Sequence, residues 1–216
     1  MKTQSMILLA LTALFCGNTT TRTGNPLLDD QASGDAVFNF DNEEIGKLPA
    51  DWTAATSIWM IVSDGTNKAM KQAGKNEGDK FNICVQNKLS YQNLEMEVRI
   101  KALEGVEDQG GGLVWRYVDS KNYYITRANP LENNFRVYKV VNGNRKQMET
   151  ANVSFKKGEW YNVKMVMSGS TITCYYNGQK LLSHNDDTFP NAGLVGFWSK
   201  ADAVSLFDDL KIKPLK

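Results

Sequence analysis

Apolar and polar residues alternate with a period of two along much of the chain. The clearest segment is 94–101, which reads Leu94, Glu95, Met96, Glu97, Val98, Arg99, Ile100 and Lys101. Successive side chains of a β-strand point to opposite faces, so this segment predicts a strand with one buried and one solvated face. The alternation returns in 161–167, 172–176 and 204–212, and no segment beyond the N-terminus sustains the 3.6-residue period of a helix.

Turn signals separate these runs. Asp64-Gly65, Asn142-Gly143 and Asn177-Gly178 each favour a tight hairpin. We predict strands at 35–40, 57–63, 67–72, 80–86, 92–103, 111–119, 122–129, 134–141, 145–150, 159–168, 170–176, 179–183, 192–199 and 203–213. Short, regularly spaced strands without intervening helices predict an all-β fold, a two-sheet antiparallel β-sandwich.

Several short segments of the chain are distinctive. They are 40–41 and 46–52 at the start, 111–117, 122–124 and 127–134 in the centre, and 193–198 and 207–210 near the end. Together they resemble exported bacterial domains of the concanavalin A-like (laminin-G-like) jelly-roll superfamily, over about residues 35–214. The nearest named family is the 3-keto-disaccharide hydrolase domain, formerly a domain of unknown function.

This resemblance implies a role around carbohydrate and, for the named family, cleavage of oxidised disaccharides. The segment 109–112 reads Gln-Gly-Gly-Gly, where that family usually carries an Asn-Ser-Gly-type segment before its central arginine strand. The alternating acidic motif of laminarinase-like glycoside hydrolases is also missing, and the closest local match is 95–97.

Charge and local motifs exclude several function classes. The chain has 25 basic and 24 acidic residues and a formal net charge of +1, which gives no electrostatic reason to expect nucleic acid or an anionic membrane as partner. The glycine run at 110–112 lacks the features of a phosphate-binding loop, and no Gly-x-Ser-x-Gly nucleophile elbow occurs.

Residues 1–17 are predicted to be an export signal. Lys2 provides the positive start, and the apolar stretch 7–15 is too short to span a bilayer. Cys16 follows directly, which is typical of a lipoprotein signal, although Phe15 is larger than the residue that usually precedes the lipidated cysteine. Ordinary cleavage near Gly17 is the alternative.

Residues 18–34 are rich in Thr, Gly, Asn and Asp and predict a flexible tether before a domain at 35–214. We therefore expect an exported protein of the periplasm or cell surface, or a secreted one. A lipid anchor at Cys16 is the only membrane attachment that the sequence suggests.

Export leaves Cys84 and Cys174, which would form a disulfide or remain two buried thiols. Cys174 shares its phase with Ile172 and Tyr176, as a packing residue would. We therefore favour the two buried thiols.

Three arginines are predicted to lie on one sheet face. Pairing 113–118 with 122–127, and the latter with 134–140, places Arg116, Arg127 and Arg136 in one phase, together with Tyr123, Tyr138 and Asn129. The opposite phase carries the core set Leu113, Trp115, Tyr117, Ala128, Phe135 and Val137.

Guanidinium forks suit carboxylates and vicinal hydroxyls, and tyrosine rings suit sugar faces. These six residues are therefore our candidate ligand-binding set, and the alternative is a set of Arg–acid ladders on a solvated sheet. Arg127→Ala is predicted to abolish ligand binding and to leave thermal unfolding nearly unchanged.

Asp208 is in phase with apolar neighbours and is predicted to point toward the core, where a carboxylate needs a cation or hydrogen-bond donors. With Asp41 it would supply hard oxygen ligands to a structural calcium. The alternative is that Asp208 caps backbone amides at a bend.

No catalytic residue can be assigned from the sequence. His184 is the only histidine, so it offers neither a histidine-based metal site nor a relay. Four loop acids could converge near the arginine face: Glu107, Asp108, Asp119 and Glu132. A glycosidase would need two such acids facing each other across the bond.

We put first a carbohydrate-binding or carbohydrate-associated sandwich that engages an oligo- or disaccharide. The second interpretation is a glycan-cleaving enzyme of the 3-keto-disaccharide hydrolase type. The third is a laminin-G-like protein-binding module.

Overall fold

The computed structural model describes residues 34–216, so the predicted signal and almost all of the predicted tether, at 1–33, lie outside the described residues. Among residues 34–216, no helix is long and apolar enough to cross a membrane. The strands are β1 (Ala36–Phe38), β2 (Trp52–Thr56), β3 (Trp59–Asp64), β4 (Asn67–Gln72), β5 (Phe81–Tyr91), β6 (Leu94–Glu104), β7 (Gly112–Asp119), β8 (Asn122–Asn129), β9 (Asn134–Val141), β10 (Asn144–Asn152), β11 (Trp160–Ser168), β12 (Thr171–Tyr176), β13 (Gln179–Asn185), β14 (Gly193–Lys200) and β15 (Val204–Pro214).

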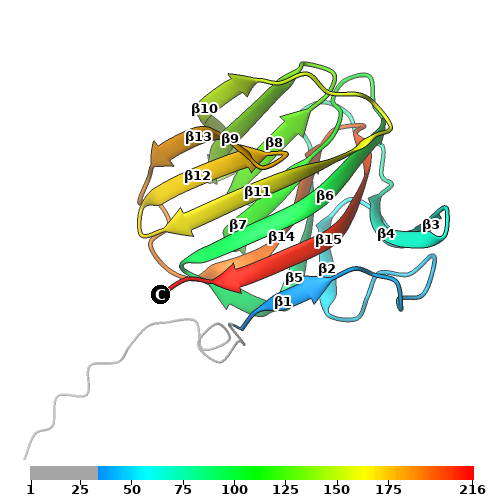
Figure 1. Ribbon diagram of the computed structural model, residues 1–216, viewed down its shortest axis with the longest axis horizontal. Coiled ribbons are helices and arrows are strands. Elements are labelled where there is room, and N and C mark those ends of the chain that lie inside the picture. The colour runs from blue at the N-terminus through cyan, green and yellow to red at the C-terminus, as the bar shows by residue number, and fades with distance from the viewer. Residues whose placement is uncertain (1–33) are drawn as a thin grey trace, which may run out of the picture.

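These strands form two antiparallel sheets that pack face to face (Figure 1). The eight-stranded sheet has the order β13-β12-β11-β6-β15-β4-β3, with β1 paired to β15. The seven-stranded sheet has the order β10-β9-β8-β7-β14-β5-β2. The predicted all-β sandwich is therefore confirmed.

The core lies between the two sheets and follows the alternation of the sequence. The neighbouring strands β6 and β11 of the eight-stranded sheet pair in register, which places Met96 beside Met165 and Val98 beside Val163 on the buried face. In the middle of the sandwich, Phe197 of the seven-stranded sheet stacks on Phe207 of the eight-stranded sheet, with ring centroids 4.8 Å apart. Such large apolar contacts supply most of the free energy that holds two sheets together.

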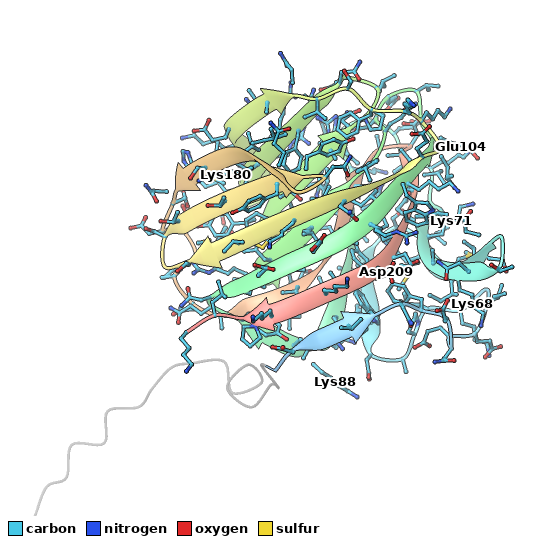
Figure 2. All side chains as sticks on the ribbon, in the orientation of Figure 1. Lys68, Lys71, Lys88, Glu104, Lys180 and Asp209 are labelled. Atoms are coloured by element: carbon cyan, nitrogen blue, oxygen red, sulfur yellow. The ribbon has the colours of Figure 1, made fainter. Side chains whose placement is uncertain are left out.

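The outer face of the eight-stranded sheet is charged, as the alternation of β6 predicts. Its side chains form cross-strand ion pairs, among them Lys164–Glu95 at 2.7 Å and Arg99–Asp209 at 3.0 Å. In Figure 2 this sheet lies nearer the viewer, and Asp209 is labelled on β15. This is an ordinary solvated sheet face.

Two hairpins have the turn chemistry that the sequence indicates. Asn142-Gly143 joins β9 to β10 with φ angles of 52° and 82°, and Asn177-Gly178 joins β12 to β13 with φ angles of 46° and 80°. Positive φ at both positions gives the tight turn whose twist matches antiparallel strands.

The fourteen predicted strands all correspond to observed ones, but β2 was not predicted. It pairs with β5 at the edge of the seven-stranded sheet, and its register shifts between Ala54 and Thr56. Four of its five residues are Ala or Thr, so it lacks a strong apolar alternation.

Candidate functional site

The outer face of the seven-stranded sheet differs from that of its partner because it is apolar and aromatic. It carries a second buried cluster made of Ile83, Val85, Val114, Tyr117, Tyr123, Ile125, Tyr138, Val140 and Trp198. The rings of Tyr117 and Tyr123 stack with centroids 5.8 Å apart. The aromatic rings of this cluster are 0–8% exposed, so they form a second apolar layer beneath the surface of this face.

An ion network lies beside these aromatic residues and centres on Arg127, whose side chain is only 2% exposed. Its Nη2 donates to both oxygens of Asp108 at 2.9 Å and to Oε1 of Glu132 at 3.1 Å. Arg136, directly opposite Arg127 on β9, donates through Nη1 to Oε2 of Glu132 at 3.1 Å. The repulsion between the two cross-strand arginines is thus offset by the carboxylate of Glu132, which accepts hydrogen bonds from both.

The loop that carries Asp108 is held by a second acid. The carboxylate of Asp202 accepts the backbone amides of Val106, Glu107 and Asp108, with the shortest contact at 2.7 Å. Gly105 begins this loop with a φ of 138°, a conformation that side-chain-bearing residues rarely adopt. The backbone around Asp108 is therefore fixed before any ligand arrives.

The loop that carries Glu132 is fixed by asparagines. Asn129 Oδ1 accepts the amides of Leu131 and Glu132, while Asn129 Nδ2 donates to Asp108 at 3.0 Å. Asn134 Nδ2 donates to Glu132 Oε2 at 2.8 Å. Asn129 therefore ties the two acidic loops together, and Glu132 is held in one orientation.

The environment separates the two carboxyl groups. The hydrogen bond from Arg127 lowers the pKa of Glu132 to about 2, with further help from Asn134 and Arg136. Burial raises the pKa of Asp108, although the charge of Arg127 opposes that change. Glu132 has a side chain that is 41% exposed, whereas that of Asp108 is 3% exposed. The accessible carboxylate, Glu132, is therefore the weaker base, and the buried carboxylate, Asp108, is the stronger base.

Five of the six candidate ligand-binding residues lie on this face. Arg127, Arg136 and Asn129 belong to the ion network, while Tyr123 and Tyr138 belong to the aromatic cluster. The network and the cluster meet where Arg136 Nη1 lies 3.4 Å from the hydroxyl of Tyr138. Their contact with a ligand stays a prediction.

The sixth residue, Arg116, is not on this face, so its predicted placement was wrong. The register of β7 against β8 shifts after Trp115, and Arg116 takes a φ of 45°. Its guanidinium donates to the carbonyls of Gln92, Phe189 and Gly169 at 2.9, 2.6 and 2.8 Å, and thereby ties three connecting segments together. The irregularity also reverses the phase of Tyr117, which joins the outer cluster and not the predicted core set.

The geometry around Asp208 resembles the capping alternative. The carboxylate is buried and accepts the side-chain amide of Asn67 at 2.6 Å and the backbone amide of Asp209 at 2.8 Å, where Asp209 has a φ of 50°. Asp41 is exposed. Among residues 34–216, no group of three or more His, Cys, Asp or Glu side chains is arranged to hold a metal ion. The calcium hypothesis stays untested.

Two of the four loop acids lie near the arginine face and two do not. Asp108 and Glu132 converge on Arg127. Glu107 instead accepts the amide of Gly78, and Asp119 accepts the amide of Lys121 in the turn between β7 and β8.

Cys84 and Cys174 are buried free thiols, which confirms the interpretation that we favoured. His184 lies on β13 with Nδ1 3.1 Å from Glu149 Oε1, away from the ion network. It therefore has no part in the candidate site.

Arg145 and Trp198 are site residues that we did not predict. The guanidinium carbon of Arg145, on β10, lies 4.7 Å from the ring centroid of Tyr138 and 5.5 Å from that of Trp198. Charged and polar residues occur on both faces of β10, so the sequence gives no phase for Arg145. Trp198 alternates with the core residue Phe197, and this was the available signal for its outward direction.

The profile of a family described as the 3-keto-alpha-glucoside-1,2-lyase-like domain matches residues 35–213 of the chain. No curated protein gives a significant match.

Solved structures share the fold at low identity. The carbohydrate-binding module CBM66 from Bacillus subtilis is 18% identical with a TM-score of 0.64, covering 76% of this chain and 95% of that one. A protein of unknown function with a galectin-like fold from Bacillus subtilis is 10% identical with a TM-score of 0.61, covering 85% and 96%. A β-glucanase from Bacillus licheniformis is 12% identical with a TM-score of 0.59, covering 86% and 100%. At these identities the likeness shows the fold alone, a concanavalin A-like sandwich.

Proposed function

Because the chain belongs to the 3-keto-alpha-glucoside-1,2-lyase-like domain family, we propose that it binds a glucoside on the outer face of the seven-stranded sheet. Glu132, Arg136 and Tyr138 are the residues that contact the sugar. The observation that carries this proposal is that Glu132 is both accessible and held in one orientation by two arginines and an asparagine.

An ionised carboxylate held in this way is suited to adjacent sugar hydroxyls. Each hydroxyl donates one hydrogen bond to it, and hydrogen bonds to a charged group are stronger than those between neutral groups. Arg136 donates to the sugar oxygens from the same side, and the hydroxyl of Tyr138 lies beside it, 3.4 Å from Arg136 Nη1. Because Arg127 and Asn134 already fix Glu132, little conformational entropy is lost on binding.

The same electrostatics favour binding over acid–base catalysis. A general base works best when its pKa lies near the working pH, whereas the pKa of Glu132 is about 2. Asp108 is the stronger base, but Arg127 and Asn129 occupy its oxygens.

A second candidate function rests on the family description, which names a lyase of 3-keto-α-glucosides. In such an elimination a base removes the proton at C2, beside the ketone. The electron pair forms the C1–C2 double bond as the C1–O bond breaks, and the aglycone leaves with that oxygen, which takes up a proton from water. Asp108 is the group whose raised pKa suits this role, once a bound substrate draws Arg127 away from it.

The experiment that separates the two functions measures retention and turnover in parallel. The mature protein is incubated with trehalose and with 3-keto-trehalose, and NMR monitors both line broadening and new products. Binding without turnover supports the first function, and formation of an unsaturated keto sugar supports the second.

Variants test the residues. Glu132→Gln keeps the shape but removes the charge, and it should weaken binding by about 10-fold or more, since a hydrogen bond to a charged group is worth roughly 1.5–3 kcal/mol. Glu107→Gln is the matched control, because Glu107 lies on the neighbouring loop and bonds to Gly78. Equal losses in both variants would contradict the proposed site.

A further inference from the structure

Arg145 differs from the other arginines of residues 34–216. Arg99 pairs with Asp209, Arg127 and Arg136 pair with Glu132, and Arg116 donates to three carbonyls. Within residues 34–216, Arg145 forms no ion pair, and its buried Nη1 has no hydrogen-bond partner. A partly buried cation normally requires an acceptor, so the lack of one here needs an explanation.

The immediate surroundings of this cation are aromatic. The guanidinium lies 4.7 Å from the ring centroid of Tyr138 and 5.5 Å from the centroids of both Trp198 and Phe81. Cation–π attraction to these rings offsets part of the lost hydration, but it satisfies no N–H group. Burial accordingly lowers the pKa of Arg145.

Two neighbouring polar atoms are unpartnered as well. The indole Nε1 of Trp198 and the hydroxyl of Tyr123 are both buried without a well-aligned hydrogen bond. Burial raises the pKa of the Tyr123 hydroxyl, and a poorly aligned hydrogen bond from the Trp198 indole opposes that change. An indole N–H and a guanidinium N–H can only donate, and a tyrosine hydroxyl can donate too. The missing partner is therefore an acceptor.

The charges nearby leave Arg145 in excess. Arg127, Arg136, Asp108 and Glu132 sum to zero, and Lys200 is paired with Asp79 at 2.9 Å. Among these seven groups, only Arg145 has no oppositely charged group within ion-pair distance. A planar carboxylate matches the guanidinium fork and is the acceptor that would balance this charge.

We propose that Arg145, Tyr123 and Trp198 form an anionic subsite, and that the natural ligand is an acidic sugar whose carboxylate binds there. This inference rests on the proposed function, because the sugar ring of the same ligand lies on Glu132 and Arg136. Tyr138 links the two parts, since its hydroxyl meets Arg136 while its ring lies beneath Arg145. The side chain of Arg145 is partly exposed on the edge strand β10, whereas Tyr123 and Trp198 are 0% exposed, so the proposal requires the Arg145 side chain to rotate when the carboxylate binds.

The test compares methyl α-D-glucuronide with methyl α-D-glucoside, which differ only in the C6 carboxylate. Calorimetry with the mature protein should show that the glucuronide binds about 10-fold more tightly than the glucoside. Added salt should weaken the binding of the glucuronide but not that of the glucoside. Arg145→Met keeps apolar contact with the rings but removes the charge. It should abolish the preference for the glucuronide over the glucoside.

Arg99→Met is the matched control, because Arg99 also stacks on a tryptophan, Trp160 at 4.7 Å, but on the other sheet. It should leave the preference intact. In a second measurement, the indole N–H resonance of Trp198, assigned with Trp198→Phe, should shift with the glucuronide and not with the glucoside.

The outcomes separate the two proposals. If both sugars bind equally and Arg145→Met changes neither affinity, the anionic subsite is wrong and the proposed function stands. If neither sugar binds, the proposed function fails and the subsite fails with it. A preference that survives Arg145→Met at unchanged melting temperature also overturns the subsite.

Discussion

Replacing Arg127 with alanine tests how deeply the ion network is buried. The sequence predicted an exposed arginine whose loss would hardly affect unfolding, and the structure contradicts this because the side chain is 2% exposed. The substitution leaves Asp108, itself 3% exposed, without its cation. Removing one partner of a buried pair costs roughly 3–5 kcal/mol. Asp108 keeps its hydrogen bond from Asn129, so we expect the lower end, about 3 kcal/mol.

For a domain of this size, 1 kcal/mol corresponds to roughly 2–4 °C in melting temperature, so Arg127→Ala should melt about 6–12 °C lower.

The loss of stability in Arg127→Ala should also depend on pH. Burial already raises the pKa of Asp108, and losing the opposing charge of Arg127 raises it further. An acid with a raised folded-state pKa favours the folded state below its ordinary value of 3.8 and loses that contribution as pH rises through the folded-state pKa. The deficit of the variant should therefore be smallest in acid and largest at neutral pH.

Urea unfolding across the acidic and neutral range measures both effects. Arg136→Ala is the control, because that side chain is 28% exposed and Arg127 still holds Glu132, so its loss should cost less than about 1 kcal/mol. Adding Asp108→Asn to Arg127→Ala should recover part of the stability at neutral pH. A cost below about 1 kcal/mol for Arg127→Ala, or a deficit that does not change with pH, would refute a buried charged pair.

The contacts of Glu132, Arg116 and Asp208 each have a measurable consequence. The pKa of Glu132 lies near 2, below its ordinary 4.5, so the carboxylate is fully charged above about pH 4.5 and loses its charge as pH falls toward 2. Sugar binding measured by NMR should therefore be constant from about pH 5 to 8, and a binding midpoint near neutrality would contradict the role of Glu132. Arg116→Ala leaves three carbonyls without a donor and should cost about 2–4 kcal/mol in urea unfolding, while sugar affinity stays unchanged; a weakened affinity would return Arg116 to the site. Because Asn67 and a backbone amide already bind Asp208, excess chelator should leave the melting temperature unchanged, and a fall would support the calcium hypothesis.

The sequence predicts the sandwich well because alternation and turn chemistry are local signals. Strand β6 alternates strictly, and its register against β11 follows from matching the two apolar sides. The strand β2 escapes such reasoning because its Ala and Thr residues give little contrast between faces.

The candidate site was predicted only in part because its decisive features are non-local. The alternation along β8 and β9 correctly placed Arg127 and Arg136 together. The register shift at Arg116 could not be predicted, because the residue with positive φ there is an arginine and not a glycine. Asp108 reaches Arg127 from 19 residues away through a loop pinned by Asp202, and no periodicity encodes that contact.

The arrangement around Arg127 divides two properties that a proton-transfer catalyst must combine in one carboxyl group. Glu132 is accessible, but the arginines that orient it also remove its basicity. Asp108 keeps its basicity through burial, but the same burial and its bonds to Arg127 and Asn129 close it to a substrate. Binding needs only the first property, so the site as it stands suits recognition. Elimination would require a ligand that competes for Arg127 strongly enough to release Asp108, and a ketone oxygen gaining negative charge next to the acidic carbon is such a competitor.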